Sequence, residues 1–78
     1  MPTAFVCITT EPEHMVKVLR ELKLVEGVEE AEMVYGIYDI IAIVKGDSIE
    51  SLKKIVTEQI RRINKVVATT TMMVVKSE

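Results

Sequence analysis

Apolar and polar positions along the chain follow two patterns, one typical of buried strands and one typical of amphipathic helices. Residues 4–8, AFVCI, are continuously apolar and partly β-branched, which predicts a strand buried on both faces. From about residue 11 to 24 the apolar positions recur every three or four residues, which predicts a helix with one apolar side. The apolar positions of this helix are Met15, Val18, Leu19 and Leu22.

The same alternation of strand and helix patterns occurs in the second half of the chain. After Gly27, a helix stop signal, residues 28–34 predict a second strand, and residues 40–44, IIAIV, predict the most strongly apolar one. A second amphipathic helix follows, and residues 66–75 predict a long closing strand. The apolar side of the second helix comprises Ile49, Leu52, Val56, Ile60 and Ile63.

Each predicted helix is preceded by residues that indicate a capping box. Thr10 pairs with Glu13 before the first helix, and Asp47 pairs with Glu50 before the second. The order strand, helix, strand therefore occurs twice. Two right-handed β-α-β units joined by a hairpin predict an α+β fold, the ferredoxin-like βαββαβ sandwich, with a four-stranded antiparallel sheet and both helices on one face. We expect residues 1–78 to form a single domain.

The closing strand is unusual because neither of its faces is polar. Its even positions from 66 to 74 read Val, Ala, Thr, Met, Val, and its odd positions from 67 to 75 read Val, Thr, Thr, Met, Val. A sheet covered by helices on one side only should alternate between apolar and polar positions. We therefore expect a second copy of the chain to cover the open face, giving a homo-oligomer that is a dimer or a ring of dimers.

Composition excludes several classes of function. The net charge of −2 argues against direct nucleic-acid binding, which calls for a strongly basic domain. No apolar run approaches the roughly 20 residues of a membrane span, and the first residues lack the pattern of a signal peptide. We expect a cytoplasmic protein with no membrane partner. Apolar residues make up 49% of the 78, more than a small one-layer core needs, which again favours self-association.

Few residues offer chemistry of their own. Cys7 lies within an apolar run, where a buried small side chain is favoured over a reactive thiol. His14 is the only histidine and has no cluster of cysteines or acids beside it, so we expect a surface residue, no metal and no cofactor. Arg61, Arg62 and Lys65 could form a basic patch, but we favour a solvated helix end, where cations complement the helix dipole.

Two segments carry a resemblance to a known family. The stretch GVEEAEMVYGIYDIIAIV, residues 27–44, and the later VVATTTMMV resemble the ligand-binding and assembly domain, or RAM domain, of the Lrp/AsnC (feast/famine) transcription regulators. In that family a Gly-x-Tyr-Asp element lies on the loop between the second and third strands, and a Thr-rich segment starts the last strand. The resemblance implies amino-acid sensing coupled to oligomerisation. Full-length members carry an N-terminal helix-turn-helix, and because nothing precedes the first strand here, direct DNA binding is not expected.

A free amino acid needs a carboxylate for its ammonium, and backbone amides or hydroxyls for its own carboxylate. Asp39 could supply the first, and Gly36 would let backbone amides approach. Two threonine hydroxyls could bind the ligand carboxylate, and a tyrosine could form a wall. The predicted ligand-binding residues are Tyr35, Gly36, Tyr38, Asp39, Thr69 and Thr71. Taken singly, the same residues also fit a plain hairpin turn and an ordinary strand.

Three functions compete at this point. The leading hypothesis is an amino-acid sensing and oligomerisation module that binds its ligand between subunits. The second is a structural adaptor that binds no ligand and co-assembles with a full-length Lrp/AsnC regulator. The third is a small enzyme, since dimeric ferredoxin-like folds also host monooxygenases and isomerases. No candidate base lies near Cys7 or Tyr38 in the sequence, so we do not expect an enzyme.

Overall fold

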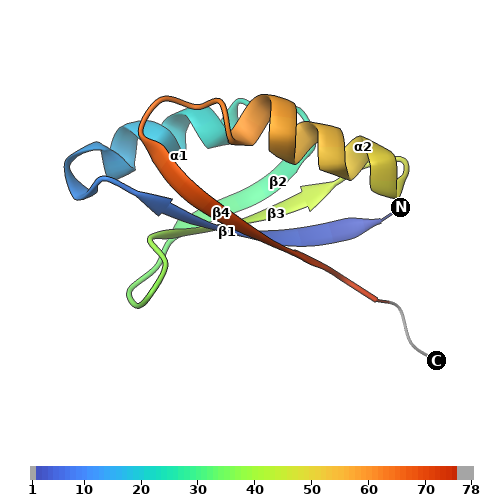
Figure 1. Ribbon diagram of the computed structural model, residues 1–78, viewed down its shortest axis with the longest axis horizontal. Coiled ribbons are helices and arrows are strands. Elements are labelled where there is room, and N and C mark those ends of the chain that lie inside the picture. Colours follow the sequence, from blue (N-terminus) through green and yellow to red (C-terminus); the bar gives the residue numbers. More distant parts are fainter. Residues whose placement is uncertain (1, 76–78) are drawn as a thin grey trace.

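Four antiparallel strands form one sheet, and both helices lie on the same face of it, which confirms the predicted ferredoxin-like arrangement (Figure 1). The computed structural model describes residues 2–75, and the strand order is β2-β3-β1-β4. A short 3-10 turn, η1, precedes the first helix, and a π-helical segment, η2, continues the second. In chain order the elements are β1 (Thr3–Thr10), η1 (Pro12–His14), α1 (Met15–Lys23), β2 (Val28–Met33), β3 (Ile40–Lys45), α2 (Ile49–Lys54), η2 (Ile55–Ile60) and β4 (Val66–Met73).

The core lies between the sheet and the helices. Strand β1 is central, and Val6 stands opposite Ala42 of β3 and Thr71 of β4. Because side chains alternate across a strand, Val6 points to the helices whereas Phe5 and Cys7 point to the open face. Every second residue of β1 and β3 therefore joins the core. The buried core residues are Ala4, Val6, Ile8, Val18, Leu22, Ala31, Ile40, Ala42, Val44, Leu52, Val56 and Ile60.

The start of the first helix differs from the prediction. Because Pro12 has no N–H, the chain first makes a 3-10 turn, in which the N–H of His14 donates to the carbonyl of Glu11 at 2.9 Å. The predicted capping box of Thr10 and Glu13 is wrong. Thr10 ends strand β1, and its hydroxyl donates to the Glu11 carbonyl at 3.3 Å instead of capping the helix.

The second helix also begins one residue later than the predicted cap. Ser48, in an extended conformation, accepts a hydrogen bond from the backbone N–H of Ser51 at 3.1 Å, so the capping box of Asp47 and Glu50 is wrong. A serine hydroxyl at this position satisfies the free amide of the first turn as well as a carboxylate does. The apolar face of the helix is confirmed except for Ile49, which is exposed in its first turn.

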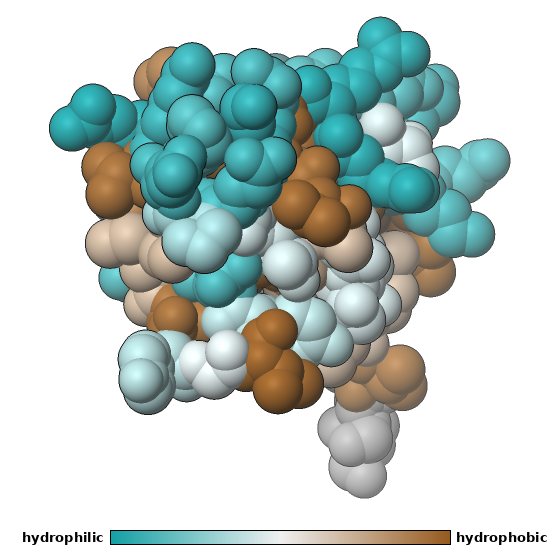
Figure 2. Space-filling model, turned by 60° about the vertical axis from the view of Figure 1, so that its left-hand side comes forward, coloured by the Kyte–Doolittle hydropathy of each residue, from teal (hydrophilic) through white to brown (hydrophobic). Residues whose placement is uncertain are grey.

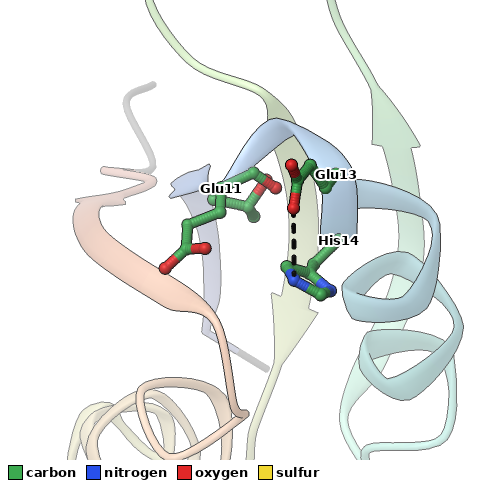
Figure 3. A network of polar contacts seen from close by, with 4 residues as sticks. Glu11, Glu13 and His14 are labelled. Atoms are coloured by element: carbon green, nitrogen blue, oxygen red, sulfur yellow. Dashed lines mark hydrogen bonds and ion pairs between the residues drawn. The ribbon is translucent and has the colours of Figure 1, made fainter.

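His14 lies at the surface at the beginning of α1. Its imidazole Nε2 is 3.9 Å from a carboxylate oxygen of Glu13, which points toward it, while Glu11 points away from both (Figure 3). No group of three or more potential metal ligands occurs among residues 2–75. A single histidine beside one exposed acid is a solvated pair with little effect on stability.

Gly27 turns the chain from α1 into β2. Helix α1 ends at Lys23, one residue before the predicted end of the helix, and Gly27 adopts a φ of 101°. Its carbonyl accepts the N–H of Lys45 at 2.8 Å. A Cβ at this position would lie 2.7 Å from Cδ1 of Ile55 and 3.0 Å from the carbonyl oxygen of Lys45. Both the backbone conformation and the packing therefore require glycine.

Replacing Gly27 with alanine should lower the free energy of unfolding by about 2–4 kcal/mol, because strain at a positive φ adds to a steric clash. Gly36→Ala is the matched control, since Gly36 also has a positive φ, of 154°, but no atom lies within 4 Å of the added Cβ. Urea unfolding should show a clearly smaller loss for the control. Equal losses in the two variants would show that the contact with Ile55 and Lys45 is unimportant.

Candidate functional site

The loop between β2 and β3 protrudes from the edge of the sheet, away from the helices (Figure 1, green). At its tip Tyr35 and Ile37 are fully exposed, and a side chain at Gly36 would meet no atom within 4 Å. Tyr38 and Asp39, at the base of the loop, are partly buried. The loop thus has an anchored base and a tip that makes no packing contribution to its own chain.

Three hydrogen bonds at Asp39 fix the base of this loop. Its N–H donates to the carbonyl of Ile8, and its carbonyl accepts the N–H of Val34, both at 2.9 Å. Its carboxylate oxygen Oδ2 accepts the backbone N–H of Thr10, also at 2.9 Å. The acid therefore joins the loop to the end of β1, a structural role that the sequence alone did not reveal. The other oxygen, Oδ1, has no hydrogen bond within residues 2–75 and is available to a ligand.

Thr69 and Thr71 do not lie on this loop. They are on the helix-facing side of β4, which is the edge strand farthest from β2, and line a groove of about 430 Å³ beside α2 and η2. Thr69 pairs with Ile8 of β1, whose carbonyl accepts the N–H of Asp39, so one strand lies between the threonines and the base of the loop. The groove is lined by Lys53, Val56, Thr57, Arg61, Thr69, Thr71 and Met73.

Two cations of this groove were not recognised as site residues from the sequence. Lys53, Thr57 and Arg61 recur every four residues and so share one side of a helix, a spacing that could have indicated their common position. Arg61 does follow the last residue of η2, as expected for a helix end, and both Arg61 and Arg62 are exposed. Only Arg61 of this pair faces the groove.

The open face of the sheet is apolar at its centre. Phe5 of β1 stands between Ile43 of β3 and Met72 of β4, and Phe5 and Met72 are exposed. Cys7, in the next row, is buried as expected. Figure 2 shows the same asymmetry: hydrophilic side chains gather on the upper, helical side, and pale and brown ones gather on the lower side beneath the sheet. No helix among the described residues is long and apolar enough to cross a membrane.

A second cleft, of about 720 Å³, lies at the opposite end of α2. Its lining mixes carboxylates of Glu26, Glu29 and Asp47 with the ammonium of Lys45. The three carboxylates outnumber the single ammonium, so the lining carries an excess of negative charge.

The domain thus has a four-stranded sheet with one helical layer, an exposed apolar face and a protruding loop. Comparison with protein families agrees: the family model of the Lrp/AsnC ligand binding domain matches residues 3–78. The chain belongs to this family. It is therefore a regulatory effector-binding and oligomerisation module, and its fold is that of the ligand-binding domains of transcription regulators.

Solved structures give the same result. The chain is 35% identical to FFRP-DM1, with a TM-score of 0.91, and the match covers 96% of this chain and 100% of the other. It is 25% identical to E. coli AsnC over 97% of its own length and 52% of AsnC, with a TM-score of 0.91. It thus spans about half of that regulator. No curated protein sequence is similar enough to count as a relative.

A more distant structure shares the fold. The feast or famine regulatory protein Rv3291c from M. tuberculosis, in complex with L-methionine, is 24% identical, with a TM-score of 0.82. The match covers 99% of this chain and 52% of that protein.

The structural and ligand-binding roles of Asp39 can be separated by two substitutions. Asp39→Ala removes the acceptor for the Thr10 N–H and should cost about 1–2 kcal/mol of unfolding free energy, because a partly buried amide loses its charged partner. Asp39→Asn keeps an oxygen in the same place and should cost less than about 0.7 kcal/mol. Chemical denaturation measures both values, and hydrogen exchange at Thr10 reports the bond directly. An Asn variant as unstable as the Ala variant would contradict this account.

Proposed function

We propose that the chain binds a free amino acid at a site formed between copies of the domain. The observation that carries this proposal is the loop of residues 34–39, whose base is fixed through Asp39 while Tyr35 and Ile37 at its tip are exposed. A loop held at its base by three hydrogen bonds is pre-organised for a partner that lies outside the subunit.

The chemistry of the loop favours a ligand with an ammonium group. Oδ1 of Asp39 can accept one of its N–H groups in a charge-assisted hydrogen bond. The open backbone at Gly36 permits close approach, and Tyr38, partly buried beside it, supplies an apolar wall. Thr69 pairs with Ile8, whose carbonyl accepts the N–H of Asp39, so one strand separates it from the loop base, and a second copy would add further residues to the site. The L-methionine complex of Rv3291c supports the choice of ligand class.

The second copy is brought close by the open face of the sheet. Phe5, Ile43 and Met72 form an apolar row there, and two such rows facing each other would be removed from water in a two-fold dimer. Further contacts between dimers would complete a ring. An effector that binds between copies shifts the equilibrium between two assembly states only if it binds one of these states more tightly than the other. This is how ligand and oligomer would be coupled in regulation.

Calorimetry with the twenty amino acids should detect saturable binding by the wild-type protein. Asp39→Asn should weaken that binding by about tenfold or more, because the ammonium loses its opposite charge while the loop keeps its hydrogen bond to Thr10. The stability of the variant, measured as described for Asp39, is the control for folding. If no amino acid binds, the sensing role is refuted and the structural adaptor becomes the better explanation.

The proposed dimer is tested by a charge on the open face. Met72→Glu should raise the dimer dissociation constant by about a hundredfold or more, since an unpaired carboxylate would be buried at the contact. Val16→Glu is a matched control, because Met72 is 51% exposed and Val16 is 50% exposed, but Val16 lies on α1, on the helical side of the sheet. Sedimentation equilibrium measures both. A wild-type monomer at all concentrations, or equal effects of the two changes, would rule out this interface.

A further inference from the structure

The groove between β4 and the second helix has a charge opposite to that of the whole chain. The protein carries a net charge of −2, yet Lys53 and Arg61 both line this groove and no acidic residue is among the side chains that form it. Neither cation has an acidic partner within 4.0 Å in the part of the chain that the structure describes. Two unpaired cations facing one concavity create a local positive potential that attracts an anion.

The floor and the walls of the groove differ in chemistry. Val56 is buried and Met73 is half-buried, so the floor is apolar. The hydroxyls of Thr69 and Thr71 point to the same side of β4, two residues apart. The hydroxyl of Thr57 is already committed, because it donates to the carbonyl of Lys53 at 2.8 Å. The donors left for a ligand are therefore the two cations and the two strand hydroxyls.

The helical wall of the groove is itself unusual. It consists of η2, where the N–H of Arg61 donates to the carbonyl of Val56 at 2.9 Å, five residues back instead of four. π-Helical segments are rare in proteins. Where they do occur, they are often found at functional sites. Arg61, which carries the guanidinium, directly follows Ile60, the last residue of this segment. An irregular helix, a cation cluster and a hydroxyl pair thus coincide in one groove.

From this geometry we propose that the groove binds the carboxylate of a small aliphatic organic acid, with Arg61 as its principal contact. The guanidinium offers paired N–H donors that match the two oxygens of a carboxylate, with Lys53 and the hydroxyls of Thr69 and Thr71 as further donors. A short aliphatic group would rest on Val56 and Met73. Because the groove contains no carboxylate, it has no partner for an ammonium group and favours acids that lack one.

This inference shares Thr69 and Thr71 with the proposed amino-acid site and to that extent rests on it. In an assembled site the groove of one copy would hold the ligand carboxylate, and Asp39 of another copy would hold the ammonium. The groove can nevertheless be tested without the loop, because it is complete within one chain.

The test uses isovalerate as the probe and isovaleramide, its neutral counterpart of similar shape, as the chemical control. Titration followed by backbone NMR should show saturable shifts at Arg61, Thr69 and Thr71 with isovalerate only. Arg61→Ala should weaken isovalerate binding by about tenfold or more, and Thr69→Val, which removes a hydroxyl at constant shape, by about threefold or more. The matched control Arg62→Ala, also exposed but outside the groove, should change it less than about twofold.

The outcomes separate this inference from the proposed function. Isovalerate binding that depends on Arg61 but not on Asp39, in a protein that binds no amino acid, would support the groove and refute amino-acid sensing. Amino-acid binding that depends on Asp39, with no saturable isovalerate binding, would refute the groove alone. Equal losses in Arg61→Ala and Arg62→Ala, or equal binding of isovaleramide, would also refute it, because they would indicate general electrostatics or apolar contact without carboxylate recognition.

Discussion

The sheet has two apolar sides and only one layer of helices, and the rest of the structure depends on this imbalance. On the helical side Val6 and its neighbours are completely buried by α1 and α2. On the other side Phe5 and Met72 remain exposed at the centre of the sheet. Burial of apolar surface is the main favourable term in folding and association, so the free energy that the open face can still contribute is released only on contact with another surface. In the proposed dimer, assembly would continue the burial that begins with folding.

The candidate ligand-binding residues lie near the end of the central strand β1. The two halves of the candidate site lie on either side of β1: the N–H of Asp39 donates to the carbonyl of Ile8, and Thr69 of β4 pairs with Ile8 from the other side. In the proposed site between copies, the contacts that hold the ligand would also hold the copies together, which would couple ligand binding to assembly.

Strand and helix positions were predictable because they follow from hydrophobic periodicity, and the periodicity is strong in this chain. The details that failed are set by competition among polar groups. Thr10 was expected to cap a helix, but its backbone N–H donates to the carboxylate of Asp39, which is 29 residues away in the sequence. The second helix is capped by Ser48 and not by Asp47. The loop residues were recognised by resemblance to a family. Lys53 and Arg61 were not, because their common groove exists only once β4 lies beside the π-helical segment.

Tyr35 and Ile37 at the tip of the β2–β3 loop are exposed, and this has an evolutionary consequence. Substitutions at Tyr35 or Ile37 carry almost no folding penalty, since neither side chain is buried in the subunit and the loop base is held by Asp39 through three hydrogen bonds. Duplicated genes could therefore diverge at these positions while the scaffold stays constant. The tip is therefore free to change, whereas the anchoring acid Asp39 is constrained by its contribution to stability.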